Sequence, residues 1–388
     1  MIYLDNNAST ELDAEVAAAM NEASALYGNP SSLHAPGRRA RRAVEEARED
    51  VAALVGARSD EIFFTSGGTE ANALAILGAT APRPGRVVTT AAEHPSVRGP
   101  ADLAAGRAGL ETSRVAPGPS GALDPECLSA AIGGDTALVS VMAANNEYGG
   151  VFPVAEAAAA AHRQGALFHT DAVQAVGRIP VDLRAWNADL ASFSAHKLHG
   201  PKGVGALFVR RGVRIDPLAA GGGQEKGVRP GTENTVGIVG FGAAARLART
   251  RVSREAPEIA ALRDDFERAV LSRVSGARVI GQTAPRLPNT AAILFEGVAG
   301  DALLIALDLA GVAVSVGSAC SSGTLSPSPA ILSLGIPAEA ARGVVRFSLS
   351  RRTTREELAR VSEMLPDLVA TARGACAGSR PLAEVASR

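Results

Sequence analysis

Short apolar runs of β-forming residues alternate with helical patterns through the first half of the chain. Five runs have the length and composition of buried strands, at 86–90, 137–142, 166–169, 190–193 and 205–209. Helical patterns lie before or between them, at 38–55, 69–77 and 154–164. Because parallel strands need a crossover between them, this order predicts a doubly wound α/β domain with a mainly parallel sheet.

Polar residues follow four of the five expected strands. They are Glu93 with His94, then Asn145, then Asp171, and then 194–197. In doubly wound sheets, ligands bind beyond the carboxyl ends of the strands, where these residues would meet. The pattern therefore predicts a cofactor site at one edge of the sheet.

The pattern changes near residues 252–257. Beyond this point we expect a helix at 258–274, strands near 291–295 and 343–349, and a helix near 355–364. This change divides the expected architecture into a large cofactor-binding domain at 14–255 and a smaller α+β domain. The smaller domain would combine 1–13 with 256–388.

The composition limits the partners. A formal net charge of -1 gives no electrostatic footprint for nucleic acid or an anionic membrane. The start, MIYLDNNAST, lacks the basic and apolar regions of a signal peptide, and the most apolar stretch, 303–316, is too charged to span a bilayer. Three widely spaced cysteines offer neither a disulfide framework nor metal-ligand spacing. We expect a cytoplasmic protein with no bound metal.

Lysine is scarce in this chain. Only three of the 39 basic residues are lysines, namely Lys197, Lys202 and Lys226. Arginine can replace lysine as a cation but not as an amine that loses its proton. Lys197 directly follows an expected strand and is a candidate Schiff-base lysine, with an ordinary surface lysine as the alternative. Lys202 and Lys226 lie in glycine-rich loops and are typical loop cations.

Two further motifs match the needs of one cofactor. The glycine turn of TSGGTEANALAI (65–76) opens a helix and predicts an anion site, with a plain N-cap by Thr69 as the alternative. In HTDAVQA (169–175), Asp171 is placed to hold a protonated ring nitrogen or to cap a helix. Together with Lys197 these features indicate pyridoxal phosphate. His94 and His196 would then stack on the ring or move protons, or have structural roles.

Nearly the whole chain resembles the cysteine desulfurases of the NifS-like family, within the class V aminotransferase group. The resemblance implies pyridoxal-phosphate fold type I, the fold of aspartate aminotransferase, and a homodimer. Ten stretches carry it in the same order: YLDNNAST (3–10), GNPSSLHAPGR (28–38), FTSGGTEAN (64–72), EHPSV (93–97), VMAANNEYG (141–149), HTDAVQA (169–175), SAHKLHGPKG (194–203), GTEN (231–234), GSACSS (317–322) and RFSLS (346–350).

The resemblance implies a role for each matching position. The catalytic residues would be Lys197, which carries the cofactor, Cys320, the nucleophile, and His94, which stacks on the ring and transfers protons. Asp171 would pair with the pyridine nitrogen, and Gln174 would bond the ring oxygen. The remaining cofactor-binding residues would be Gly68, Thr69, Ser194 and His196 at the phosphate, Asn145, and Thr232 from the second subunit. The substrate carboxylate would be held by Asn29, Asn145 and Arg346.

Cys320 lies within SVGSACSSG (315–323), which matches the S-x-G-S-A-C class of the family, the class with the longer loop. The segment 315–329 is rich in serine, glycine and proline, which predicts a mobile loop. Such a loop would let the thiolate attack the substrate sulfur and then carry it to an acceptor. The implied reaction converts L-cysteine to L-alanine and leaves a persulfide on Cys320. A buried apolar cysteine is the alternative for this residue.

Two positions depart from the family pattern. Ser9 stands where threonine is usual, and Ser350 stands where glycine is usual, just beyond Arg346. The change at Ser9 keeps the hydroxyl, whereas the side chain of Ser350 would either crowd the carboxylate pocket, and so affect the fine substrate preference, or only alter a turn.

The resemblance leaves the sulfur acceptor open. Iron–sulfur cluster assembly, through a scaffold or sulfurtransferase protein, is the leading expectation. The alternatives are transfer-RNA thiolation, DNA phosphorothioation, and a different class V lyase or aminotransferase on the same fold. A non-catalytic scaffold is disfavoured by the presence of Lys197, Asp171, His94 and Cys320.

Overall fold

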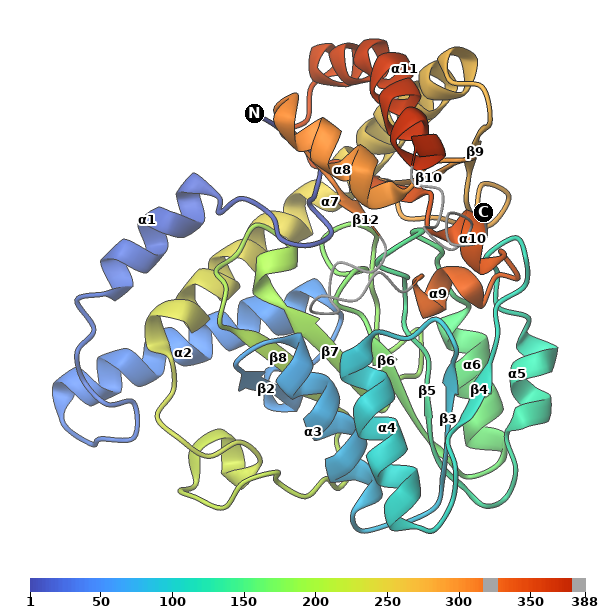
Figure 1. Cartoon of the computed structure of the whole chain (residues 1–388). Helices are drawn as coiled ribbons and strands as arrows, with labels where there is room; N and C mark the ends of the chain where they lie inside the picture. The colour runs from blue at the N-terminus through green and yellow to red at the C-terminus, as the bar shows by residue number, and fades with distance from the viewer. Residues whose placement is uncertain (317–326, 379–388) are drawn as a thin grey trace, which may run out of the picture.

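The computed structural model describes residues 1–316 and 327–378, the last four by their backbone alone. Its larger sheet has seven strands in the order β2-β8-β7-β6-β5-β3-β4 (Figure 1). Their bounds are β2 Ile62–Thr65, β3 Arg86–Thr90, β4 Ser113–Val115, β5 Thr136–Ser140, β6 Leu167–Asp171, β7 Leu190–Ser194 and β8 Gly205–Val209.

The strand directions confirm the mainly parallel sheet. The strands β4, β3, β5, β6 and β7 pair in parallel, and β8 alone runs against its neighbours β7 and β2. The five strands expected from the sequence are present, with ends shifted by at most two residues. Strands β2 and β4 are additional.

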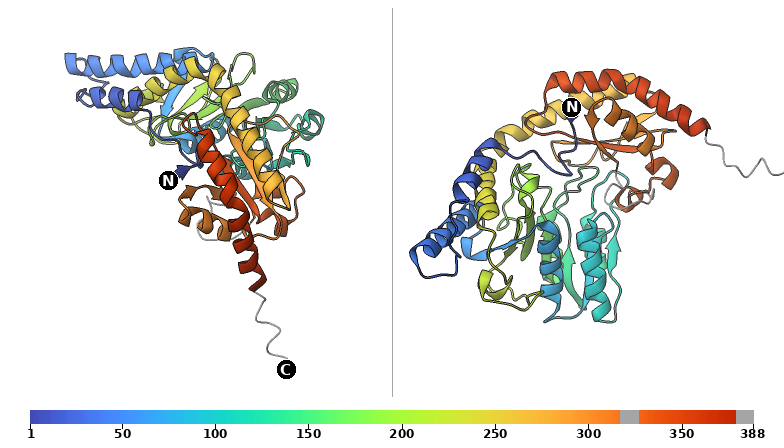
Figure 2. Two further views of the ribbon diagram at one scale, coloured as in Figure 1. Left: turned by 90° about the horizontal axis from the view of Figure 1, so that it is seen from above. Right: turned by 60° about the vertical axis from the view of Figure 1, so that its left-hand side comes forward.

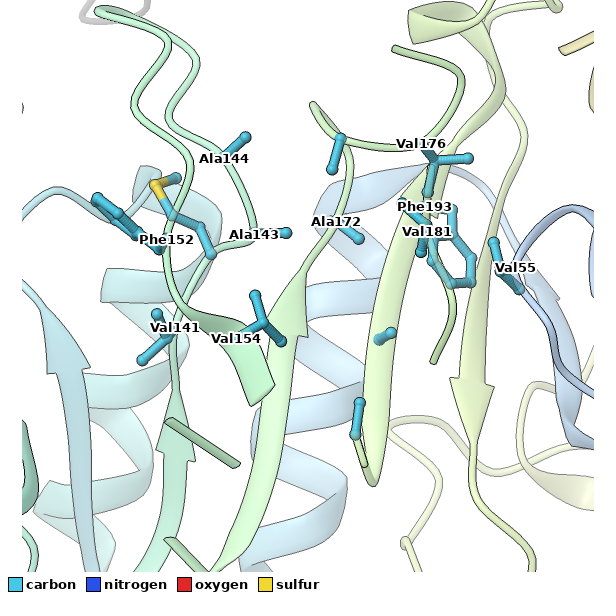
Figure 3. Close-up of a cluster of buried hydrophobic side chains, with 14 of the residues drawn as sticks. Val55, Val141, Ala143, Ala144, Phe152, Val154, Ala172, Val176, Val181 and Phe193 are labelled. Carbon is cyan, nitrogen blue, oxygen red and sulfur yellow. The ribbon is translucent and has the colours of Figure 1, made fainter. Parts of the chain in front are cut away.

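Helices cover both faces of this sheet, as a doubly wound fold requires. On one face α3 and α4 contribute Leu74 and Val97 to one buried apolar cluster. On the other, α2, α6 and α7 contribute to a second, which includes Val44 and Phe241; part of it is drawn in Figure 3. The bounds are α2 Ala35–Leu54, α3 Gly68–Thr80, α4 Pro95–Arg107, α5 Pro125–Ala131, α6 Val154–Arg163 and α7 Thr235–Arg273, with short 3-10 turns η1 Ser59–Glu61, η2 Ala195–Lys197 and η3 Gln224–Gly227.

Helix α7 differs from the sequence expectation. We expected a break near 252–257 and a helix from 258, but α7 runs unbroken for 39 residues with Pro257 inside it. Its first half packs Phe241 into the core of the large sheet, and its second half packs Phe266 into a separate core. An internal proline destabilises a helix by about 3 kcal/mol. The burial of apolar side chains at both ends of α7 offsets this cost.

A smaller sheet lies beyond the carboxyl ends of the large one (Figures 1 and 2). Its antiparallel strands are ordered β12-β13-β10-β9, and the N-terminal strand β1 pairs in parallel with β11 beside it. Phe266 and Phe347 meet edge to face in its core, with ring centroids 5.2 Å apart. The bounds are β1 Ile2–Tyr3, β9 Ala277–Val279, β10 Thr290–Phe295, β11 Val312–Ala313, β12 Ser315–Val316, β13 Val344–Ser348, α8 Gly300–Leu309, α9 Pro329–Leu332, α10 Ala338–Ala341 and α11 Arg355–Gly378.

Two N-terminal helices, α1 (Ala14–Ala23) and α2, extend to one side of the molecule (Figures 1 and 2). Helix α2 crosses α7 closely, because a Cβ at Gly242 would lie 2.6 Å from the Cα of Ala47. The connection between α1 and α2 exposes Tyr27 and Leu33, which are 81% and 89% accessible. Among the described residues, no helix combines the length and apolarity that crossing a bilayer requires.

The segment after β1 joins the two sheets. The side chain of Asn7 is buried and donates to the Asn146 carbonyl at 3.1 Å and to Thr290 Oγ1 at 2.9 Å. Its own oxygen accepts from Asn289 Nδ2 at 2.9 Å. Asn146 lies in the turn after β5 of the large sheet, whereas Asn289 and Thr290 lie at the start of β10 in the small sheet. The side-chain amide of Asn7 therefore bonds both sheets.

We expect Asn7→Ala to lower the free energy of unfolding by about 2–4 kcal/mol, because three buried hydrogen bonds are lost and their partners stay buried. Urea denaturation measures this change. Asn21→Ala, at an exposed position on α1, is the matched control and should change stability by no more than about 0.5 kcal/mol. Equal stability of the two variants would contradict the role of Asn7 at the junction.

Candidate active site

The structure brings most of the expected site residues to one edge of the large sheet. Strand β2 is parallel to β7, since both pair antiparallel with β8, so the turn into α3 lies at this edge too. The residues that follow the ends of β2, β3, β5, β6 and β7 are Gly68, Thr69, His94, Asn145, Asp171, Gln174, Ser194, His196 and Lys197.

The first turn of α3 has the features of an anion site. Gly67 is its N-cap residue and offers no side-chain cap, so the alternative of Thr69 as the cap is wrong. The amide groups of this turn have no intrahelical partner. A Cβ at Gly68 would lie 2.8 Å from Val173 Cγ2 and 3.6 Å from the Cβ of Ser194. Glycine therefore lets this backbone come close to β6 and β7, beside the hydroxyl of Ser194.

Asp171 ends β6 with a side chain that is almost completely buried. Its Oδ1 accepts from the backbone N–H of Val173 at 3.0 Å, and its Oδ2 accepts from Asn72 Nδ2 at 2.8 Å. Each carboxylate oxygen can accept a second hydrogen bond. No helix begins in this described stretch of the chain, so the helix-cap alternative is wrong; Asp171 bonds the local turn and can still receive a protonated ring nitrogen.

Lys197 lies in the short turn η2 directly after β7. Its Nζ donates to the carbonyl oxygens of Asn7 at 2.6 Å and Ala8 at 2.8 Å. The amine thus reaches the N-terminal segment that joins the two sheets. Lys202 and Lys226 are exposed, which agrees with their expected role as loop cations.

Two histidines flank this lysine. His94 caps α4, where its Nδ1 lies 2.7 Å from Ser96 Oγ and accepts from the Ser96 N–H at 3.1 Å. Burial lowers the pKa of His94; Asp171 raises it, and Lys197 and Arg98 lower it further.

The second histidine, His196, has its Nδ1 3.2 Å from the hydroxyl of Ser9. Burial, followed by the charges of Lys197 and Lys202, lowers the pKa of His196 to about 4. This imidazole is therefore neutral near pH 7. The hydroxyl retained at Ser9, where threonine is usual, is the group that meets it.

Gln174 is held by the chain on both sides of its amide. Its Nε2 donates to the Asn7 carbonyl at 3.0 Å, and Arg178 Nη1 donates to its Oε1. Because the oxygen faces Arg178, the amide nitrogen faces the site, where it keeps a second N–H. That orientation suits the expected contact with the ring oxygen of the cofactor.

Arg346 enters the site from β13 of the smaller sheet. Its Nη2 donates to Asp5 Oδ1 at 2.7 Å and its Nη1 to the Asn146 carbonyl at 2.8 Å. Its Nε is buried and makes no hydrogen bond within the described part of the chain. A buried N–H without a partner is costly, so this group is suited to a ligand.

Asn145 is more enclosed than the sequence suggested. Its side chain is fully buried, its Nδ2 donates to the Ala92 carbonyl at 3.0 Å, and its Oδ1 accepts from the N–H groups of Glu147 and Tyr148. The amide thus orders the turn after β5. Contact of Asn145 with cofactor or substrate stays a prediction.

Three expected residues do not join this cluster. Asn29 is exposed in the connection between α1 and α2, and Thr232 is exposed before α7. Figure 1 shows the α1–α2 connection at the left, away from the strand ends. Cys320 lies outside the described residues.

Comparison with known proteins identifies the family. The aminotransferase class-V family model matches residues 2–361. The chain is 49% identical to a cysteine desulfurase of Cereibacter sphaeroides, with 95% of each chain covered, and 47% identical to the cysteine desulfurase NifS of Azotobacter vinelandii, with 96% of this chain and 93% of that protein covered. A solved structure described as a NifS-like protein superimposes with a TM-score of 0.88 at 35% identity, covering 95% of this chain and 99% of that one.

The chain belongs to the cysteine desulfurases of aminotransferase class V. The family uses pyridoxal phosphate, and the fold is pyridoxal-phosphate fold type I, as the sequence predicted. The residues at the sheet edge fit this group: an uncapped helix start beside Gly68 for the phosphate, a buried acid at Asp171 for the ring nitrogen, and the amine of Lys197. Among the described residues, no cluster of potential metal ligands competes with this assignment.

Several residues of this desulfurase site were not foreseen. Asn72 bonds Asp171, Arg178 fixes Gln174, and Asn7 accepts from Lys197. Glu93, which was expected at this edge of the sheet but without a role, is buried beside the site, and burial followed by the charge of Asp171 raises the pKa of Glu93 to about 8. The signal for Asn72 was a lone amide within the apolar run ANALAIL of helix α3. Nothing in the sequence pattern pointed to the carbonyl of Asn7.

Ser350, the second departure from the family pattern, is hydrogen-bonded within its own turn. Its N–H donates to Thr353 Oγ1 at 3.0 Å, and its Oγ accepts from the Arg352 N–H at 3.2 Å. The residue also lines a cavity of about 40 Å³ that reaches Lys197. The serine therefore affects the wall of this cavity.

We expect Gly68→Ala to raise the dissociation constant of pyridoxal phosphate on the order of tenfold, because the new Cβ clashes with Val173 Cγ2 and moves the anion-binding backbone. Adding Val173→Ala removes the clashing atom and should restore affinity. Titration of the apoprotein, followed by absorbance, measures both. Gly99→Ala, where a Cβ would meet nothing within 4 Å, is the control. Unchanged affinity in Gly68→Ala would argue against the phosphate position.

Proposed function

We propose that this cysteine desulfurase transfers the sulfur of L-cysteine to Cys320 as a persulfide and releases L-alanine. In this step the Cys320 thiolate forms a bond to the substrate Sγ, and the Cβ–Sγ bond breaks. The electron pair of that bond stays with the carbon skeleton, which takes up a proton to become alanine.

The anchoring of both flanks of 317–326 is the observation that carries the proposal. On one side, Ser315 of β12 pairs with Arg346 of β13. On the other, Ser328 caps α9 and hydrogen-bonds the carboxyl of Glu147, in the turn after β5. Cys320 follows Val316 by four residues, which span at most about 14 Å when extended. The short distance along the chain from this anchored flank supports Cys320 as the nucleophile of the site.

Side chains of the protein would bind the cofactor and move the protons. Bound pyridoxal phosphate supplies the electron sink that makes the Cα proton of the substrate acidic. Lys197 would hold the cofactor and accept that proton at Nζ, Asp171 would keep the ring nitrogen protonated, and Gln174 would bond the ring oxygen. The phosphate would accept hydrogen bonds from the backbone N–H groups of Gly68 and Thr69 and from the side chains of Ser194 and His196. His94 would stack on the ring.

The substrate carboxylate is assigned to Arg346, with Asn145 and Asn29. The support for Arg346 is its buried Nε without a partner in the described chain and its position beside the anchored flank of the cysteine segment. Asp5 holds the other end of the guanidinium and so presents it in one orientation.

We also propose that the working unit is a homodimer. Thr232, expected to reach the phosphate of the second subunit, is exposed on this chain, as is Asn29. The neighbouring Tyr27 and Leu33 offer exposed apolar surface on the α1–α2 connection. A second subunit would cover these side chains and complete both sites.

For the sulfur acceptor we propose a scaffold or sulfurtransferase protein of iron–sulfur cluster assembly, in the cytoplasm. Transfer-RNA thiolation and DNA phosphorothioation are the competing destinations. Following radiolabelled sulfur from Cys320 to each purified acceptor separates them. Transfer to the scaffold alone supports the proposal, and transfer only to a thiolation or phosphorothioation protein contradicts it.

Single-turnover analysis of Cys320→Ala tests the reaction. We expect the variant to keep the cofactor absorbance and to form no persulfide, because the attacking thiolate is gone. Cys127→Ala, at an exposed free cysteine, is the matched control and should form alanine and persulfide as the native protein does. If Cys320→Ala releases alanine at the native rate, the protein is a lyase or aminotransferase of the same fold.

Arg346→Lys tests the carboxylate site. We expect the KM for L-cysteine to rise on the order of tenfold with a smaller change in kcat, because lysine keeps the charge and loses the planar fork that binds a carboxylate in two places. Steady-state kinetics with L-cysteine measure both constants. Arg342→Lys, at an exposed position shortly before β13, is the control. An unchanged KM in Arg346→Lys would remove Arg346 from the substrate site.

A further inference from the structure

A continuous line of hydrogen bonds links the acid of the site to its stacking histidine. Asn72 Nδ2 donates to Asp171 Oδ2 at 2.8 Å and to Ser96 Oγ at 2.9 Å. Ser96 Oγ in turn lies 2.7 Å from His94 Nδ1. Asn72 and Ser96 are both buried, and they come from α3 and α4, which pack side by side on one face of the sheet.

The direction of every hydrogen bond in this line is fixed by its end at Asp171. The Asn72 amide has two N–H groups, and both are used, one toward Asp171 and one toward Ser96. The reversed amide would place its oxygen against the carboxylate, which repels it. Asn72 Oδ1 stays buried with no partner in the described chain, so the two donated bonds outweigh that cost.

These hydrogen bonds also determine which ring nitrogen of His94 carries the proton. Ser96 Oγ receives a hydrogen from Asn72, which leaves its own hydroxyl hydrogen available for His94 Nδ1. The backbone N–H of Ser96 donates to the same Nδ1 at 3.1 Å. Because this nitrogen accepts twice, the neutral imidazole carries its proton on Nε2.

We propose that Asn72 and Ser96 are positioning residues that hold His94 as the Nε2–H tautomer and tie that state to the ionised carboxylate of Asp171. The inference rests on the proposed function for its catalytic meaning. His94 then presents a hydrogen-bond donor at Nε2, and this nitrogen has no lone pair to take a proton. Proton acceptance from the substrate falls to Lys197.

The charges around His94 act in the same direction. Lys197 from η2 and Arg98 from its own helix α4 disfavour a cationic ring, as does burial, whereas Asp171 from the end of β6 favours one. The net effect lowers the pKa of His94, which keeps the ring neutral at the pH where a thiolate is available.

Nitrogen-15 spectra of histidine-labelled holoenzyme test the proposal directly. The chain has six histidines, and His94→Gln assigns the signal. Near neutral pH we expect a protonated Nε2 and an unprotonated Nδ1 on His94. Ser96→Ala should shift the tautomer ratio on the order of tenfold, through the loss of one donated hydrogen bond, and Ser96→Thr should restore it.

Asn72→Asp tests the link to Asp171, because Asn72 reaches His94 only through Ser96. Two carboxylates in contact would share a proton, and the hydroxyl of Ser96 would turn toward the new acid. We expect the His94 signals to move in Asn72→Asp but not to move further when Ser96→Ala is added. Thr89→Val removes a buried hydroxyl with no partner in the described chain and is the matched control.

A His94 that is protonated on Nδ1 in the native enzyme overturns the proposal, whatever the variants do. So does an unchanged tautomer ratio in folded Ser96→Ala, or additive shifts in the double variant. The spectra need no turnover, so their failure is distinct from a failure of the desulfurase reaction, which the alanine and persulfide assay reports separately.

Discussion

The site depends on Asn7, because every hydrogen-bonding group of this buried residue is used. Its carbonyl accepts from Lys197 and Gln174, which follow strands of the large sheet. Its side-chain amide bonds Asn146 on that side and Asn289 and Thr290 on the side of the small sheet, and its N–H donates to Ser348 Oγ. Because all these hydrogen bonds meet at Asn7, a shift of one sheet relative to the other would also displace Lys197 or Gln174. The partners are the side chains of Ser348, Asn289, Thr290, Gln174 and Lys197 and the carbonyl of Asn146.

The large sheet supplies the groups for the cofactor, and the small sheet supplies Arg346 and one flank of the cysteine segment. The proposed substrate site therefore lies between the two parts, next to the Asn7 segment. Asp5, two residues before Asn7, orients Arg346, and Asn6 accepts from Arg178, which orients Gln174. A short N-terminal stretch thus sets the position of the groups expected to meet the amino acid and the ring.

Sequence reasoning could predict the strands and site residues that follow from hydrophobic periodicity and residue type. It could not predict features that depend on tertiary packing. The strands at 86–90 and 205–209 were expected at their observed bounds, since buried strands are short runs rich in apolar and β-branched residues. The break expected near Pro257 is absent, because two cores hold α7 on either side of it. Lys197 and Asp171 could be proposed from residue type and strand position. Asn7 and Asn72 could not, because their roles depend on partners far away in the chain.

The electrostatics of the described site favour anionic ligands. Arg178 is buried, its donors meet only carbonyl and amide oxygens in the described chain, and burial with the charge of Arg346 lowers its pKa to about 9. Arg346, Lys197 and the start of α3 add positive potential, and the neutral His196 adds none. Burying a cation such as Arg178 among neutral oxygens is costly, and a nearby phosphate or carboxylate would offset this cost. The same positive potential favours the thiolate form of any cysteine that enters the site, including the substrate.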